Sequence, residues 1–439
     1  MRVLFTVWPN PAHLYPIVPL TWALQGAGHE VRIASHPAIA DTVTAVGLTA
    51  VAVGDKDVMP MGPGRPYPAE RERLDDITAA LNLAPADKAP WDIFSHFMLP
   101  AMWDFTPYAA DPAQPMRAMD DLVRFAKSWK PDLVLWDPCY PGGAVAAKAS
   151  GAAHARLLWG QDYFGWTMDR FAERAGEFIE NPMVETIRGA AERHGVEVDD
   201  ELLVGQWTVD PSLEGIRLPT STRIVPVRWV PYAGQTVVPE WLYEPPTRPR
   251  VAMSLGLSQR KYLVGGWGHV PNLMEMVSTL DIEVIATLDE RQLAGVPKLP
   301  DNVRTVDYVP LNQLLPTCTA MLHHGGMGTF AAACALNVPQ LITDWDAENQ
   351  TVAVGEGMEA SKHVESTVTA EYVTARGAGL PLDINVSVDA MRKQLVRILE
   401  EPSFKAGAAR VYEDVLSTPS PNDIVPILEK LTARYRGLS

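Results

Sequence analysis

A glycine-rich turn between a predicted strand and a predicted helix has the residue types that bind an anion. A strand is expected at 320–323, followed by the turn His324-Gly325-Gly326-Met327-Gly328, and Thr329 opens an alanine-rich helix. Glycines let the backbone approach a ligand closely, and the free N–H groups of a helix N-terminus attract negative charge. His324 and Thr329 can add side-chain donors. The segment predicts a phosphate site, with a tight structural turn as the alternative, whereas His323 is expected to be structural.

A histidine and an aspartate follow two predicted strands in the first third of the chain. His13 comes after the strand expected at 2–8, and Asp137 directly follows the strand expected at 133–136. Since the carboxyl ends of parallel strands lie at one edge of a sheet, both side chains are expected at that edge. A neutral imidazole can remove a proton from a hydroxyl there, and a carboxylate can fix its tautomer. The sequence thus predicts a base with an orienting acid, and helix capping stays open for both.

A short acidic segment, residues 344–350, follows the strand expected at 340–343. Asp346 and Asn349 are predicted to accept hydrogen bonds from sugar hydroxyls. Asp344 and Asp346 also match a D-x-D metal pattern, but nothing in the segment supplies a third ligand. We therefore favour sugar contact and predict no metal, with helix capping as the structural alternative.

Aromatic side chains are crowded after residue 90, among prolines and methionines and without clean periodicity. Buried core is the usual reason for such residues, but an apolar ligand pocket has the same composition. The predicted acceptor-binding residues are Trp91, Phe94 and Trp103.

Alternating strands and helices must position these residues. Further strands are expected at 29–35, 49–53, 154–159, 250–255, 282–287 and 303–306. Repeated strand–helix–strand units predict parallel sheets covered by helices on both faces. Residues 54–90, rich in proline, glycine and charge, are expected to form a long loop whose role the sequence leaves open. An α/β chain of two such halves is expected to bind its ligand between them, at the carboxyl ends of the strands.

The prolines at 226–249 suggest a connection between two domains. The predicted organisation is an N-terminal acceptor-binding domain at 1–225, a linker at 226–249, a C-terminal domain at 250–415 that contains the predicted phosphate site, and a final helix at 416–439 that packs back on the N-terminal domain.

Composition excludes several classes of function. The chain has 439 residues, 47% of them hydrophobic and 21% charged, as in globular proteins. The net charge of 37 − 53 = −16 argues against nucleic acid and anionic membranes as partners. The short apolar N-terminus, and three cysteines without metal-ligand spacing, favour a cytoplasmic protein. No G-x-G-x-x-G follows the first strand, which disfavours a dehydrogenase.

Taken together, these segments resemble the GT-B glycosyltransferases of family 1. The resemblance is strongest to the actinomycete enzymes that attach deoxysugars to macrolides, anthracyclines and other polyketides. It runs nearly end to end and is carried by residues 1–8, 13–16, 24–29, 131–136, 154–160, 204–211, 238–242, 300–304, 323–329 and 345–346.

The resemblance implies two Rossmann-like domains facing each other across a cleft, with His13 as general base and Asp137 as the acid that orients it. It implies a nucleotide-diphosphate site at His324, Gly326, Met327, Gly328, Thr329, Ser254, Ser258 and Val309, the last through its backbone to the nucleobase. Asp346 resembles the sugar-contacting acid. Two departures stand out: Ala12 replaces the usual glycine, and Ala347 replaces the glutamine of glucose-using relatives, which favours a dTDP-deoxysugar.

The implied function is inverting transfer of a deoxysugar, amino-deoxysugars included, from a dTDP-sugar to a hydroxyl of a hydrophobic polyketide aglycone. No metal or other cofactor is implied. A cytochrome-P450-like helper protein and a second copy of the chain are further candidate partners. The alternative from another class is a non-catalytic binding or helper protein with the same fold.

Overall fold

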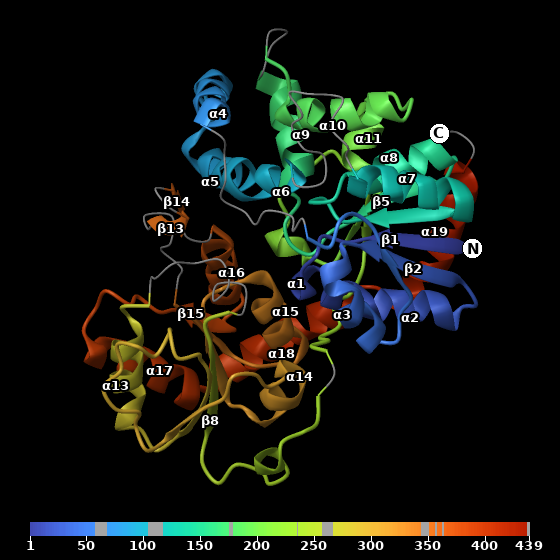
Figure 1. The fold of residues 1–439 in the computed structure, drawn as a ribbon. Helices are drawn as coiled ribbons and strands as arrows, with labels where there is room; N and C mark the ends of the chain where they lie inside the picture. The colour runs from blue at the N-terminus through green and yellow to red at the C-terminus, as the bar shows by residue number, and fades with distance from the viewer. Residues whose placement is uncertain are drawn as a thin grey trace. The chain divides into compact units, whose positions relative to one another are not determined.

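The computed structural model describes residues 1–57, 68–103, 117–174, 179–234, 236–256, 267–343, 351–355, 358–361 and 364–436. Its contacts divide the chain into two compact units, each built on a parallel sheet (Figure 1). The first unit comprises Met1–Ser212, Arg217–Arg228 and Pro419–Ser439. The second comprises Leu213–Ile216 and Trp229–Thr418.

Among the described residues, the first unit has a seven-stranded parallel sheet in the order β3-β2-β1-β4-β5-β6-β7. Its strands are β1 (Arg2–Thr6), β2 (Glu30–Ser35), β3 (Ala50–Ala52), β4 (Leu133–Trp136), β5 (Ala153–Leu157), β6 (Thr208–Asp210) and β7 (Ile224–Pro226). The central strand β4 is buried throughout, because helices cover both faces of a parallel sheet. Its Trp136 pairs with Thr6 of β1, which places the loops after these two strands side by side.

Helices surround this sheet. They are α1 (Pro11–Leu14), α2 (Val18–Gly26), α3 (Ala40–Ala45), α4 (Pro68–Leu81), α5 (Pro85–Ile93), α6 (Leu99–Trp103), α7 (Arg117–Trp129), α8 (Gly142–Ser150), α9 (Tyr163–Arg174), α10 (Pro182–Arg193), α11 (Asp200–Val204) and α19 (Pro421–Tyr435). The last helix, α19, packs on α2 and β5. His29 and Glu429 form an ion pair of 3.0 Å at this contact, so the end of the chain is held against its beginning.

The prediction of one long loop at 54–90 is wrong, because α4 and the start of α5 lie within it. In α4, Leu74, Ile77 and Leu81 recur at helical spacing, and the last two are buried. The charged residues between them hid this spacing in the sequence.

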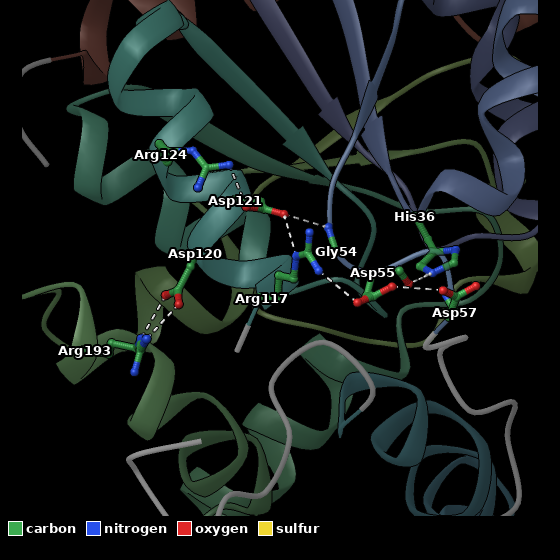
Figure 2. Close-up of polar contacts among 9 residues, drawn as sticks. All are labelled: His36, Gly54, Asp55, Asp57, Arg117, Asp120, Asp121, Arg124 and Arg193. Atoms are coloured by element: carbon green, nitrogen blue, oxygen red, sulfur yellow. Dashed lines mark hydrogen bonds and ion pairs between the residues drawn. The ribbon is translucent and has the colours of Figure 1, made fainter. Parts of the chain in front are cut away.

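Polar contacts tie the chain after β3 to α7 (Figure 2). The Gly54 N–H donates to the Asp121 carboxylate over 3.1 Å, and Arg117 donates to the Asp55 carboxylate over 2.8 Å. The Asp55 carbonyl accepts from the ring of His36 over 2.7 Å. These contacts hold Gly54 and Asp55 against α7 and against His36, which follows β2.

The second unit has a six-stranded parallel sheet in the order β10-β9-β8-β11-β12-β15 within the part of the chain that is described. The strands are β8 (Arg250–Ser254), β9 (Glu283–Thr287), β10 (Val303–Thr305), β11 (Ala320–His323), β12 (Gln340–Ile342) and β15 (Gly379–Pro381), with a separate hairpin of β13 (Thr351–Gly355) and β14 (Met358–Ser361). The helices are α13 (Val270–Ser278), α14 (Leu311–Leu314), α15 (Met327–Ala335), α16 (Val364–Ala375), α17 (Val388–Glu400) and α18 (Pro402–Ser417). The two parallel sheets confirm the predicted α/β class.

The proline-rich stretch predicted as a linker at 226–249 lies mostly in the second unit. It includes the short helical turn Glu240–Leu242, and Leu242 is buried in the same apolar cluster as Val309. A search of the described helices finds none with the length and apolar character to span a membrane.

Candidate active site

His13 is presented by α1, the short helix that follows β1. The side chain of Asn10 caps this helix by accepting the Ala12 N–H over 2.9 Å, and Pro11 suits its first turn. His13 lies in the last turn, with 12% of its side chain exposed. The cap and the proline therefore fix the backbone that carries the imidazole.

Asp137 reaches His13 from the next strand of the sheet. Its backbone N–H donates to the Thr6 carbonyl over 2.9 Å, which extends the pairing of β1 and β4 by one residue. His13 Nδ1 and Asp137 Oδ2 lie 2.6 Å apart. Because a carboxylate oxygen accepts, Nδ1 carries a proton, and in the neutral imidazole this leaves a lone pair on Nε2. The structure thus brings together the two residues predicted as base and orienting acid, in a geometry that suits proton abstraction.

Each oxygen of Asp137 accepts two hydrogen bonds from the residues that the structure describes. Oδ1 accepts from the Cys139 N–H over 2.9 Å and from the Trp159 indole N–H over 3.3 Å. Oδ2 accepts from the Trp8 N–H over 3.3 Å as well as from His13. These donors compensate for the burial of the carboxylate, which is 5% exposed, and fix its orientation.

Two indole rings flank the imidazole of His13. The ring centroid of Trp8 lies 5.0 Å from it, and that of Trp159 lies 4.4 Å from it. A pocket at the ends of β1, β4 and β5 is lined by Phe5, Thr6, Val7, His13, Ile17, Leu135, Asp137, Leu157 and Trp159. Most of this lining is apolar, and Thr6, His13 and Asp137 supply polar side chains to it.

The predicted phosphate segment forms the expected strand, turn and helix in the second unit. β11 ends at His323, which is fully buried; its ring accepts the Gly325 N–H over 3.1 Å and meets Gln340 Oε1 at 2.9 Å. His323 thus has the structural role expected of it. Gly326 caps α15 in an extended conformation, and Met327 is the first helical residue, two positions before the predicted start at Thr329. In this first turn the Met327 N–H donates to Glu365 and the Thr329 N–H to the Gly326 carbonyl, so among the bonds described the Gly328 N–H is the amide available to an anion.

Two glycines make room for the imidazole of His324. A Cβ on Gly326 would lie 2.3 Å from His324 Nε2, and one on Gly256 would lie 2.5 Å from Cε1. Gly256 also has a φ of +84°, which disfavours other residues. The imidazole is therefore packed between the loop after β8 and the start of α15, and is 7% exposed.

A carboxylate that sequence reasoning missed also lies at the start of α15. Glu365, in the first turn of α16, accepts the Met327 N–H over 3.3 Å. Desolvation raises the pKa of the Glu365 carboxyl, and the bond from Met327 opposes this rise. Nothing in the local sequence marked it, because 38 residues separate the two partners.

Some of the remaining predicted nucleotide and sugar residues lie in described parts of the second unit, and others do not. Ser254 ends β8 and is 9% exposed, and Val309 is 3% exposed in the same unit; Thr329 is half-buried in the first turn of α15. Outside the described residues lie Ser258, Asp344, Asp346, Asn349 and the side chain of Trp103.

Trp91 and Phe94, predicted to bind the acceptor, are at most 1% exposed. The ring of Phe94 packs edge-on against that of Phe164 in α9. The ring centroid of Trp91 lies 6.1 Å from that of Phe171, which is also in α9. The structure therefore places both in the core of the first unit, which is the alternative that the sequence left open.

As for a metal, the described residues contain no group of three or more His, Cys, Asp and Glu side chains placed to hold one.

Comparisons with known proteins identify the family. The model of the C-terminal domain of the erythromycin biosynthesis protein CIII-like family matches residues 271–431, and that of the N-terminal domain matches residues 22–67 and 98–256. Aclacinomycin-T 2-deoxy-L-fucose transferase of Streptomyces galilaeus is 43% identical, covering 99% of this chain and 97% of its own. The 10-deoxymethynolide desosaminyltransferase of Streptomyces venezuelae is 40% identical over 99% of this chain and 98% of its own.

The fold has solved counterparts. The crystal structure of the glycosyltransferase VinC in complex with dTDP has a TM-score of 0.78 and 35% identity, covering 99% of this chain and all of that one. The two parallel-sheet units of this chain have the GT-B fold that the resemblance implied. The chain therefore belongs to the erythromycin biosynthesis protein CIII-like family and is a glycosyltransferase.

Proposed function

We propose that this glycosyltransferase moves a deoxysugar from a dTDP-sugar to a hydroxyl of a polyketide-type aglycone, with inversion at the anomeric carbon. The observation that carries the proposal is the 2.6 Å contact of His13 with Asp137 beside a largely apolar pocket. Such a pair can deprotonate a weakly acidic hydroxyl that would otherwise be a poor nucleophile.

The choice of donor and acceptor is supported by the relatives. Two of them are named as transferases of deoxysugars, one to an aclacinomycin and one to 10-deoxymethynolide, and VinC is described with dTDP bound. The identities of 43% and 40% extend over nearly the whole chain, so the comparison includes both units. We extend the chemical class to this protein, and leave the individual sugar and aglycone to experiment.

In the proposed reaction, His13 Nε2 takes the proton of the acceptor hydroxyl as the oxygen attacks the anomeric carbon. The bond from that carbon to the diphosphate oxygen breaks, and its electron pair leaves with dTDP. Asp137 holds Nδ1–H and stabilises the imidazolium that forms. Atoms and charge balance without an oxidant, a reductant or a metal.

The developing negative charge on the diphosphate is assigned to the start of α15. The Gly328 N–H in its first turn, with the side chains of His324 and Thr329 as further donors, is fixed before the reaction begins, which makes such stabilisation effective. We assign Ser254, Ser258 and the Val309 backbone to the nucleotide and Asp346 to the sugar, as the resemblance implies. Asn349 is assigned to the sugar from its place in the acidic segment that follows β12.

Mass spectrometry of products from a panel of dTDP-deoxysugars and polyketide aglycones tests the proposed function. The panel is run with and without a cytochrome-P450-like helper protein. We expect a mass increase equal to one deoxysugar residue for at least one pair. Binding of dTDP without any turnover in either arm would instead favour the non-catalytic alternative.

Replacing His324 by alanine is expected to weaken dTDP binding. A hydrogen bond to a charged group contributes about 1.5–3 kcal/mol, so the Kd measured by calorimetry is expected to rise about 10- to 100-fold. The His13→Ala variant serves as the matched control, because it removes an imidazole from the other unit and is expected to keep the wild-type Kd. Equal affinity of His324→Ala and wild type would remove His324 from the phosphate site.

Chelation is expected to leave the reaction unaffected. The proposed mechanism uses amide and side-chain donors where metal-dependent transferases use a cation. Initial rates measured with and without excess EDTA should therefore agree. A rate that collapses in EDTA and returns with added magnesium or manganese would restore the metal interpretation of Asp344 and Asp346.

A further inference from the structure

Trp159 touches both members of the His13–Asp137 pair. It lies two residues after β5, at the same edge of the sheet as His13 and Asp137. Its indole N–H donates to Asp137 Oδ1 over 3.3 Å, and its ring centroid lies 4.4 Å from that of His13 with an interplanar angle of 50°. A single side chain thus restrains a carboxylate through its polar atom and an imidazole through its face.

Trp129 makes the same kind of polar contact away from the His13–Asp137 pair. Its indole N–H donates to the carboxylate of Glu30, the first residue of β2, over 3.3 Å. The two tryptophans therefore separate loss of an indole N–H at the catalytic pair from loss of one elsewhere in the same unit.

We propose that Trp159 is a positioning residue of the catalytic pair, which fixes Asp137 through its indole N–H and His13 through its ring. The proposal rests on the proposed function, because it assigns Trp159 a task only if His13 is the base. The proposal goes further than the proposed function because it names a side chain that affects the chemical step through its contacts with His13 and Asp137.

The physical argument concerns what remains when Trp159 is removed. Asp137 Oδ1 would keep only the Cys139 N–H among the donors described, so the carboxylate could turn about its side-chain bond. His13 sits on a four-residue helix and would lose the ring beside one of its faces, so its side chain could leave the reactive rotamer. Both changes lower the fraction of molecules in which the base is aligned, which lowers kcat and leaves ground-state binding intact.

The test compares Trp159→Phe, which keeps an aromatic face and removes the N–H, with Trp129→Phe as the matched control. For Trp159→Phe we expect kcat to fall about 10-fold, with the acceptor KM and the dTDP Kd unchanged. For Trp129→Phe we expect kcat to stay within about 2-fold, because the bond that it removes goes to Glu30 and not to the pair. Thermal unfolding of both variants verifies that they are folded.

A spectroscopic readout separates positioning from packing. The proton between His13 Nδ1 and Asp137 is expected to give a downfield resonance, identified by its absence in His13→Ala. This resonance is expected to move upfield or broaden in Trp159→Phe and to stay in place in Trp129→Phe. An unchanged resonance and kcat in Trp159→Phe, or equal losses in both variants, would overturn the positioning role. So would a change confined to KM, which would make Trp159 an acceptor contact.

A double variant distinguishes failure of this proposal from failure of the proposed function. If Trp159 acts through the base, adding Trp159→Phe to His13→Ala is expected to cause no further loss of kcat. Retained turnover in His13→Ala alone would reject the base, and with it the proposed function. An inactive His13→Ala beside a fully active Trp159→Phe would reject the positioning role only.

Discussion

Replacing His13 by alanine is expected to lower kcat by about 1,000-fold or more, the largest effect of any substitution considered. General base catalysis contributes about 100- to 10,000-fold, and the pocket that His13 lines also contains Asp137, whose carboxylate would keep three N–H donors among the described residues of the variant. The aspartate is therefore badly placed to act as a substitute base. Product formation measured by liquid chromatography over time gives kcat for both proteins.

Nucleotide affinity provides the control for this variant. His13 lies in the first unit and α15 in the second, so the calorimetric Kd for dTDP is expected to be unchanged. An alanine variant that turned over at a rate close to wild type would contradict the base assignment. Loss of activity together with loss of dTDP binding would show that the substitution damaged more than the base.

Replacing Asp137 by asparagine is expected to lower kcat about 100- to 1,000-fold. An amide can present an N–H to His13 Nδ1, which favours the tautomer whose Nε2 carries the proton and cannot act as a base. The amide also leaves one of the N–H donors of Trp8, Cys139 or Trp159 facing an N–H group. The measurement is kcat with saturating donor and acceptor.

Asp132 offers a matched control on the same strand. It directly precedes β4, whereas Asp137 directly follows it, and it accepts the Arg2 N–H over 2.7 Å at the opposite edge of the sheet. Asp132→Asn is expected to keep kcat within about 2-fold, since surface polar contacts contribute little. If both variants lost activity equally, the effect of Asp137→Asn would be attributable to the strand and not to the His13 contact.

The central strands and the residues at their ends could be predicted because local pattern and tertiary role agree there. Buried parallel strands are continuous apolar runs, so β1, β4 and β11 stand out, and the parallel order places their carboxyl ends at one edge. From that rule alone, His13 and Asp137 were expected at the same edge of one sheet, where the structure places them 2.6 Å apart.

Features that depend on distant residues could not be predicted in this way. Glu365 meets the start of α15 only through the packing of α16, and the contact of Trp159 with Asp137 joins β5 to β4. For Trp91 and Phe94, the sequence could not tell a core from a ligand pocket. An aromatic cluster has the same composition in both, and only the burial seen in the structure distinguishes them.

The anomeric configuration of the product tests the proposed mechanism most directly. One-bond carbon–proton coupling at the anomeric centre of the purified glycoside, compared with that of the dTDP-sugar donor, reports whether the centre has inverted. A base that activates the acceptor for a single displacement, as assigned to His13 with Asp137, predicts inversion. Retention of configuration would contradict this account, because it would require a covalent sugar–enzyme intermediate or another route that the His13–Asp137 pair does not provide.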